Sequence, residues 1–252
     1  MHLRLIEVTG DIDRAQHELL KGYEPRPLYN FRVAARRIRS ILKQMDSHRS
    51  RVLRKAWGGL AAVTGDARDW DVFLATSEKL LDSTKFREFE AINHDRAANA
   101  RKNVIEMLKS SLWRQHIRDW RDFLEQAEEA AASPDQARES LDRAVGKAAR
   151  RLGAARADGT DHNWHRYRIA VKEVRYVAEA NPDQPGAASL AQEARSFQTL
   201  LGDWHDTVVQ LNLLDELPPQ KVHDELAAAI RDRQAGYLSK MRTLPPIGQP
   251  EL

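Results

Sequence analysis

The sequence predicts an all-α protein made of two antiparallel four-helix-type bundles, related to one another by an internal pseudo-two-fold repeat. Three observations lead to this prediction. Amphipathic segments with helical spacing cover almost all of the 252 residues, no segment alternates as a strand would, and one helical segment occurs twice. Short connections between amphipathic helices favour antiparallel packing.

The repeated segment is positively charged in both copies. Residues 28–42 read LYNFRVAARRIRSIL, and residues 164–178 read WHRYRIAVKEVRYVA. A second pair follows at nearly the same separation, with TGDARDWDV at 64–72 and LGDWHDTVV at 201–209. Two copies at so long a period indicate two homologous half-domains. The alignment of the copies places Arg32 with Arg168, Arg36 with Lys172 and Arg39 with Arg175.

A break at Ser133-Pro134 separates the two halves, because Pro134 fits the first turn of a new helix. We therefore expect a first helical bundle over residues 1–132 and a second over residues 133–244. Residues 245–252 are expected to form a disordered tail. The two copies of the repeated helix are expected to face one another across the axis.

Turn and capping residues set the expected helix bounds. Pro25 and Pro27 separate the first two helices, and Asp66 is expected to cap the fourth. Gly202-Asp203 is expected to repeat that cap in the second half. The expected helices cover residues 3–21, 26–45, 48–64, 67–81, 84–109, 112–131, 134–157, 162–180, 187–201, 204–216 and 219–242.

Composition excludes several classes of protein. Hydrophobic residues make up 42% of the chain and charged residues 31%, as in a soluble globular protein rich in amphipathic helices. The absence of cysteine excludes disulfides and thiolate metal sites. The N-terminus lacks the pattern of a signal peptide, and no apolar run is long enough to span a membrane. We therefore expect a cytoplasmic protein that does not associate with membranes.

Charge is unevenly distributed along the chain. The formal net charge is only +3. Residues 32–55 nevertheless hold nine Lys or Arg against one acid, Asp46, and residues 143–175 hold nine against three acids. Such segregation creates a local positive field that the small total conceals.

Each copy of the repeated helix places cations beside its apolar face. In the first copy this face consists of Phe31, Ala35, Ile38 and Leu42. The cations follow the same spacing one residue later, about 100° round the helix, so they lie at the edge of the buried face. Stacked like charges repel one another, so each row requires a counter-anion. We name the first cation row Arg32, Arg36, Arg39 and Lys43, and the second cation row His165, Arg168, Lys172 and Arg175.

Two kinds of counter-anion are compatible with the rows. Acids of neighbouring helices, among them Asp66, Asp69, Asp203 and Asp206, would give a purely structural network. The cation excess of residues 32–55 is larger than these acids supply, and the pattern occurs in both halves. Both points favour a polyanion ligand, with Asp69 and Asp206 orienting arginines of the rows.

The aromatic residues bear on the kind of polyanion. Phe31, Trp164 and Tyr167 lie on the apolar faces and are better explained as core. Nucleic-acid binders commonly combine phosphate contacts with aromatic stacking. Rows of Arg and Lys without stacking groups fit a chain of phosphates that lacks bases. Binding to an RNA or DNA backbone is the first alternative.

At these residues the chain resembles the CHAD family, the conserved histidine α-helical domain. YNFRVAARRIRS (29–40) and HRYRIAVKEVRY (165–176) are similar to the two repeat helices of that family. GDARDWDV (65–72) and LGDWHD (201–206) are similar to its helix-joining elements. The resemblance covers nearly the whole chain. It implies two four-helix bundles that bind inorganic polyphosphate in a basic central channel, and an association with polyphosphate granules.

The resemblance also implies which residues hold the phosphates. Tyr29 stands where the family has a histidine, and its phenol cannot carry the positive charge of an imidazolium. Glu173 aligns with Arg37, so the two halves are expected to contribute unequally. The implied ligands are Arg32, Arg36, Arg39 and Lys43, facing His165, Arg168, Lys172 and Arg175, with Arg54 and Lys55 as further candidates.

The sequence gives little support for an enzyme. Asp69 and Asp71 point to different sides of a helix, and His162 with His165 lacks further ligands at metal-site spacing. A glycine-rich phosphate loop and a nucleophile elbow are both missing. We therefore expect a binding protein with no cofactor and no metal. The remaining alternatives are a metal-dependent phosphohydrolase and a structural interaction protein.

Overall fold

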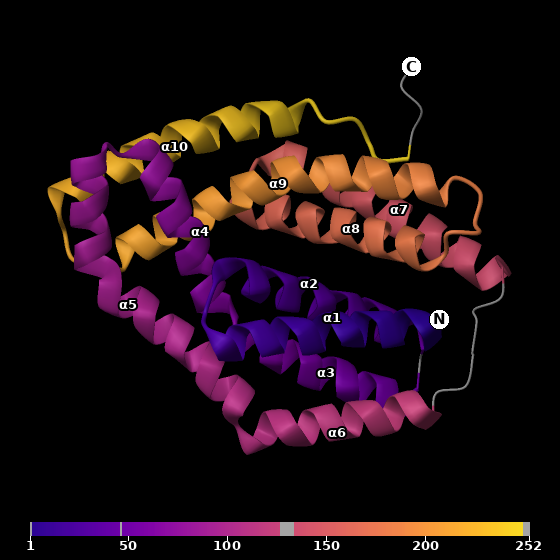
Figure 1. Ribbon diagram of the computed structural model, residues 1–252. Coiled ribbons are helices and arrows are strands. Elements are labelled where there is room, and N and C mark those ends of the chain that lie inside the picture. The colour runs from indigo at the N-terminus through magenta and orange to yellow at the C-terminus, as the bar shows by residue number, and fades with distance from the viewer. Residues whose placement is uncertain (1, 46, 127–133, 249–252) are drawn as a thin grey trace. The chain divides into compact units, whose positions relative to one another are not determined.

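The structure, a computed structural model, describes residues 2–45, 47–126 and 134–248. It divides the chain into two compact units, Met1–Ala131 and Ala132–Leu252. The predicted all-α class is confirmed, since every regular element among the described residues is a helix (Figure 1). The helices are α1 (His2–Lys21), α2 (Pro25–Gln44), α3 (His48–Val63), α4 (Gly65–Leu80), α5 (Ser83–Lys109), α6 (Ser111–Gln126), α7 (Pro134–Asp158), α8 (Asp161–Ala180), α9 (Ala187–Asp215) and α10 (Lys221–Arg242).

Most of the expected helices agree closely with these bounds. The residues expected at the end of the sixth helix, 127–131, and the boundary expected at 132–133 lie outside the described part of the chain. None of the helices in the described part is long and apolar enough to cross a membrane.

In the first unit α1, α2, α3 and α6 form a bundle (Figure 1). The core of this bundle is aromatic. Trp57 of α3 lies at its centre, with its ring centroid 6.0 Å from that of Trp113 and 5.6 Å from that of Trp120 on α6. Phe31 of α2 joins this core 5.6 Å from Trp113. These large buried rings fix α2 against α3, and so hold the first cation row beside α3.

A buried carboxylate ties α4 and α5 to the turn between α1 and α2. Asp71 of α4 accepts a hydrogen bond from the Tyr23 hydroxyl at 2.7 Å. Arg101 of α5 donates two further bonds to Asp71, at 3.1 and 3.2 Å. Because charge-assisted bonds are stronger than neutral ones, this arrangement fixes α4 at Asp71 relative to the turn before α2.

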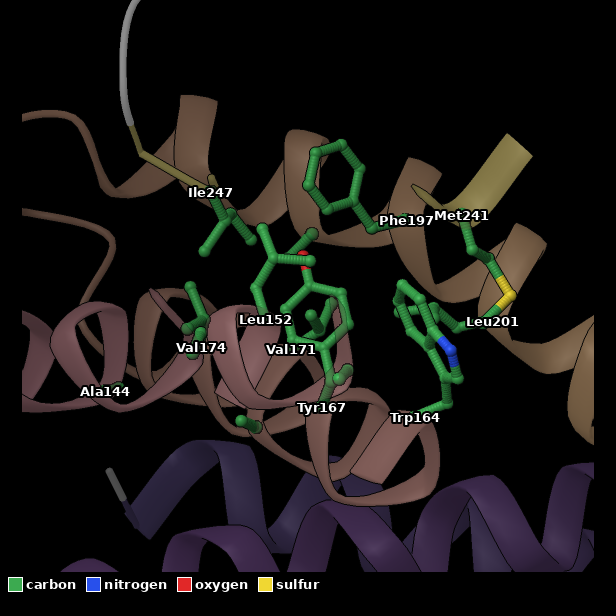
Figure 2. Close-up of a cluster of buried hydrophobic side chains, with 14 of the residues drawn as sticks. Ala144, Leu152, Trp164, Tyr167, Val171, Val174, Phe197, Leu201, Met241 and Ile247 are labelled. Atoms are coloured by element: carbon green, nitrogen blue, oxygen red, sulfur yellow. The ribbon is translucent and has the colours of Figure 1, made fainter. Parts of the chain in front are cut away.

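In the second unit, α7, α8 and α9 pack along one another, and α10 packs on α9. Figure 2 shows the core that results. Trp164 and Tyr167 of α8 are both 0% exposed, and they pack with Leu201 of α9 and Met241 of α10. The buried face predicted for α8 is confirmed, so the second cation row lies at the edge of this core.

The break predicted at Gly202-Asp203 is wrong, because α9 runs without interruption from Ala187 to Asp215. Leu201 and Trp204 flank these residues and are both 0% exposed. They lie three residues apart on one face of the helix. Burying two large side chains contributes more than the roughly 1 kcal/mol that a glycine costs inside a helix.

The cap predicted at Asp66 is also wrong. Thr64 occupies the junction between α3 and α4, and Asp66 lies in the first turn of α4. The Thr64 hydroxyl donates to the Ala61 carbonyl oxygen at 2.8 Å. Leu201 stands in the place of Thr64 in the second copy. In the first unit α3 ends at its C-cap residue Thr64, whose hydroxyl bonds to the backbone. In the second unit the equivalent residue, Leu201, is apolar, and α9 continues past it.

The disorder predicted for the tail is wrong for residues 245–248. Ile247 is 1% exposed and packs in the core of the second unit (Figure 2). The Gly248 amide donates to the Glu193 carboxylate at 3.1 Å. Burial of one isoleucine is enough to hold a short segment. Residues 249–252 lie outside the described residues.

Candidate functional site

The first cation row lies on α2 where this helix packs on α3. Arg32 and Arg36 are half-buried, whereas Arg39 and Lys43 are exposed. The solvent exposure of the side chains in the row therefore increases from Arg32 to Lys43 along the helix. It borders the buried face of α2, which consists of Phe31, Ala35, Ile38 and Leu42.

Arg32 is held by the junction between α3 and α4. Its Nη1 donates to the Ala61 carbonyl oxygen at 2.8 Å and to Thr64 Oγ1 at 2.7 Å. Burial and the adjacent charge of Arg36 lower the pKa of Arg32, while Asp69 acts in the opposite direction. Arg32 thus satisfies a carbonyl in the last turn of α3, in addition to any contact it makes with an anion.

The side chains of four predicted ligands have neither a hydrogen bond nor an ion pair with any residue that the structure describes: Arg36, Arg39, Arg54 and Lys55. The Arg39 guanidinium lies over α3, 3.6 Å from the position that a Cβ at Gly58 would take. Gly58 follows Arg54 by one helical turn, so Arg39 and Arg54 lie on the same strip of surface. The row of cations on α2 therefore continues onto α3.

Tyr29 precedes Arg32 by one turn, and its ring is in contact with two arginines. The guanidinium carbons of Arg26 and of Arg68 on α4 lie 5.5 and 5.4 Å from the centroid of its ring. These are cation–π distances. The charge of Arg68 also contributes to the lowered pKa of Arg32, which places Arg68 in the same cluster.

In the second unit, His165 of α8 meets a second histidine, His205 of α9. Their ring centroids are 4.8 Å apart and the rings are tilted by 45°. Burial, followed by the positive charges of Arg168 and Lys172, lowers the pKa of His165. Burial, Arg168, His165 and Lys172 lower the pKa of His205 to about 3. Both imidazoles are neutral at pH 7 as a result.

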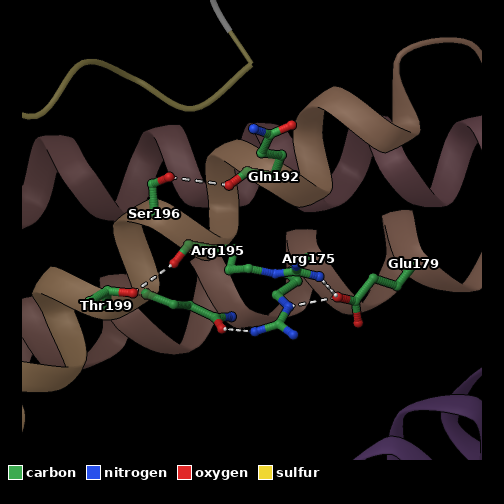
Figure 3. A network of polar contacts seen from close by, with 7 residues as sticks. Arg175, Glu179, Gln192, Arg195, Ser196 and Thr199 are labelled. Carbon is green, nitrogen blue, oxygen red and sulfur yellow. Dashed lines mark hydrogen bonds and ion pairs between the residues drawn. The ribbon is translucent and has the colours of Figure 1, made fainter.

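Arg175 is bound into a polar network between α8 and α9 (Figure 3). Its Nε donates to Glu179 at 2.7 Å, and its Nη1 donates to Gln198 at 2.9 Å. Arg195 of α9 donates to the same carboxylate oxygen of Glu179 at 3.3 Å. Much of the charge of Arg175 is therefore balanced within the protein, unlike that of Arg36 or Arg39.

The carboxylates once considered for a metal serve other contacts. Asp71 is bonded to Tyr23 and Arg101, and Asp69 acts on Arg32. No group of three or more His, Cys, Asp or Glu among the described residues could hold a metal ion.

Sequence reasoning missed the two arginines on Tyr29 and the acid beside Arg175. The spacing of Arg175 and Glu179, four residues apart on one helix, is a recognisable signal for an ion pair. The alignment of the two copies places Arg68 and His205 at equivalent positions near the predicted groove, but their contacts depend on how α4 packs near α2 and how α9 packs on α8, and the sequence does not predict them. That α2 and α8 face one another stays a prediction.

Comparison with known protein families gives a match over most of the chain. The sequence profile of the CHAD domain matches residues 5–215. The chain belongs to the CHAD domain family. The profile spans both cation rows, the Tyr29 cluster and the His165–His205 pair.

Two similar proteins are known from Mycobacterium tuberculosis, and both are called uncharacterized proteins: MT2285 of strain CDC 1551 / Oshkosh and Rv2226 of strain ATCC 25618 / H37Rv. Each is 30% identical to this chain in a match that covers 72% of this chain and 38% of the relative. The chain thus spans 38% of the length of these relatives.

A solved structure supports the fold. The crystal structure of the CHAD domain from the plant Ricinus communis is similar with a TM-score of 0.71 and 24% sequence identity. The similarity covers 96% of this chain and 85% of that domain. The all-α architecture of this CHAD domain is therefore shared with the plant domain.

Proposed function

We propose that this CHAD domain binds inorganic polyphosphate through its two cation rows. The observation that carries the proposal is the group of cations on α2 and α3 that have no acidic partner among the described residues: Arg36, Arg39, Arg54 and Lys55. Guanidinium and ammonium groups gathered in this way repel one another, and an anion relieves that repulsion. Arginine binds phosphate oxygens through two parallel hydrogen bonds, and lysine acts as a point charge.

The aromatic side chains favour phosphate without bases. Phe31, Trp164 and Tyr167 are 0% exposed, so none offers a face on which a base could stack. Tyr29 is exposed, but its ring is in contact with Arg26 and Arg68. A polymer that presents only phosphate groups therefore fits these surfaces better than RNA or DNA does.

A competition assay tests the proposal. Labelled long-chain polyphosphate is displaced at near-physiological salt by unlabelled polyphosphate, single-stranded RNA or duplex DNA at equal phosphate concentration. We expect polyphosphate to compete far better than either nucleic acid. Equal competition by RNA or DNA would make the domain a general binder of polyanions. Release of free phosphate that depends on added metal would indicate a phosphohydrolase instead.

Matched variants locate the site on α2. Arg36→Gln with Arg39→Gln removes two cations that have no acidic partner in the described residues, whereas Arg37→Gln removes an arginine that lies 3.9 Å from Asp11. All three residues belong to the same helix. We expect the double variant to bind weakly and Arg37→Gln to bind as the natural chain does. Each lost phosphate contact also lowers the slope of log affinity against log salt by about one.

Binding of this kind would place the domain on polyphosphate granules. A fluorescent fusion expressed in cells that store polyphosphate is expected to collect at the granules. The Arg36→Gln and Arg39→Gln double variant is expected to remain diffuse. A fusion that stays diffuse with the natural sequence would separate binding in solution from any role at granules.

A further inference from the structure

The second unit contains two histidines in contact, and the polyphosphate ligands implied by the family include only one of them. His165 on α8 and His205 on α9 lie with their ring centroids 4.8 Å apart, and both are half-buried. Arg168 and Lys172, from the second cation row, act on both imidazoles. Two neutral imidazoles at the end of a row of cations form an unusual pair, because each can gain a positive charge.

The charges that surround this pair come from identified helices. On α8 they are His162, Arg168 and Lys172. On α9, Asp203 and Asp206 flank His205 in sequence. Arg156 of α7 acts on Tyr167, and Arg233 of α10 acts on Asp203. The charges that act on the imidazoles are therefore the cations of α8, and they oppose protonation.

The corresponding place in the first unit has a different chemistry. In the alignment of the two copies, Tyr29 corresponds to His165 and Arg68 to His205. Tyr29 and Arg68 are also in contact, with the guanidinium carbon 5.4 Å from the ring centroid, but this contact joins a phenol to a guanidinium and contains no imidazole. The corresponding contact thus contains two imidazoles in the second unit and none in the first.

We propose that His165 and His205, together with Arg168 and Lys172, form a phosphate subsite that takes up protons from solvent when a polyphosphate chain binds. The inference rests on the proposed function, because it specifies how the same surface binds its ligand. A phosphate oxygen about 4 Å from an imidazole raises its pKa by roughly three pH units at the dielectric typical of a protein surface. That change opposes the burial and the cation charges that lower both pKa values, and it is enough to protonate His205, whose pKa is about 3 without ligand, in mild acid. By linkage, affinity then rises as the pH falls, by up to about tenfold per pH unit for each proton taken up.

Calorimetry on the natural chain tests this inference without any substitution. Long-chain polyphosphate is titrated at one pH near 6.5 in buffers that differ in ionisation enthalpy, and the dependence of the heat on the buffer gives the number of protons taken up. Internal phosphates of a long chain remain ionised throughout this range, so the protons belong to the protein. We expect about one proton per bound site, and an affinity that rises at least tenfold from pH 8 to pH 5.5.

Substitutions assign the protons to the pair. His165→Asn with His205→Asn is expected to abolish the proton uptake and to flatten the dependence of affinity on pH. His94→Asn, an exposed histidine on α5, serves as the matched control and is expected to keep both. Circular dichroism and melting temperature establish that the double variant folds. If the double variant does not fold, the imidazole NMR signals of the natural chain are followed against pH instead. We expect the signals of His165 and His205 to titrate at higher pH with polyphosphate than without it.

The possible outcomes separate the two proposals. Binding without proton uptake, or proton uptake that persists in the double variant, overturns the inference and leaves polyphosphate binding intact. Failure of the natural chain to bind polyphosphate at any pH overturns the proposed function and the inference with it. Binding whose proton uptake is lost only in the histidine double variant supports both.

Discussion

Arg32 lies 2.7 Å from the hydroxyl oxygen of Thr64, and this hydrogen bond joins the first cation row to the junction between α3 and α4. The bond has no equivalent in the second unit, because Leu201 stands in the place of Thr64 and has no hydroxyl to accept from Arg168. The two rows are therefore anchored differently, although their sequences align. The first row is attached to a helix end, and the second lies along a helix that continues.

This anchoring predicts that Arg32→Gln destabilises the first unit. The substitution removes charge-assisted bonds to Ala61 and Thr64, which contribute about 1.5 to 3 kcal/mol when the donor is charged. Arg36→Gln removes no such bond and is expected to change stability by less than about 0.5 kcal/mol. Urea unfolding followed by tryptophan fluorescence compares the two. Equal stability of both variants would mean that Arg32 is not needed at the α3–α4 junction.

The approach of Arg39 to Gly58 predicts opposite effects for two substitutions at one position. Gly58→Ala places a methyl group at an ordinary contact distance of 3.6 Å and should stabilise α3 by about 0.5 to 1 kcal/mol. Its polyphosphate affinity is expected to be unchanged. Gly58→Glu places a carboxylate beside Arg39 and is expected to weaken binding. If Gly58→Ala weakens binding as much as Gly58→Glu, bulk rather than charge decides the result.

Glu179 predicts a gain of affinity. Its carboxylate accepts from both Arg175 and Arg195, so Glu179→Gln makes more of their charge available to an anion. We expect polyphosphate to bind about threefold to tenfold more tightly, because the local net charge becomes more positive by one and attracts the anion more strongly. Glu173→Gln changes the net charge equally on the same helix, but Glu173 is paired with Lys147 outside the row. A smaller effect is expected there. Weaker binding by Glu179→Gln would show that the acid positions Arg175.

His116 predicts a loss of stability in acid. It is 6% exposed, its ring lies 4.5 Å from Trp57, and burial lowers its pKa to about 4. Above about pH 6.5 both the folded and unfolded states hold it neutral, so it contributes no pH dependence. Between 6.5 and 4 the unfolded state takes the proton first, and stability falls by about 3 kcal/mol in total.

The comparison of the natural chain with His116→Phe isolates this contribution. Stability is measured by urea unfolding at several pH values, and the difference between the two proteins is plotted against pH. This subtraction cancels the acid response of His205, which has the same sign in the second unit. A difference that does not change between pH 7 and pH 4 would contradict the role given to His116.

Helices and row positions could be predicted from sequence because they depend on neighbouring residues. Pro25, Ser47 and Asp82 mark helix starts by local chemistry, and the 3.6-residue period places Arg39 at the edge of the apolar face, next to Ile38 on α2. Gly202 is the contrary case. Its local signal indicates a helix end, but Leu201 and Trp204 are buried against other helices, and that burial keeps α9 intact.

The fine structure of the candidate site could not be predicted in the same way. The contact of Tyr29 with Arg68 depends on the position of α4 relative to α2, and the contact of His165 with His205 depends on α9. Both are relationships between segments that are distant in sequence. Periodicity locates the cations but does not say which of them already has a partner, as the difference between Arg39 and Arg175 illustrates.

The burial of Ile247 has a practical meaning for anyone who wishes to produce this domain. The match to the family ends at residue 215, yet Met241 of α10 and Ile247 beyond it belong to the same core as Trp164 and Leu201. A fragment that ends at residue 215 would lack Met241 and Ile247, and so would expose Trp164 and Leu201 to water. It would be expected to aggregate during purification, whereas a fragment that extends through Gly248 retains the side chains of this core that pack against α8 and support its cation row.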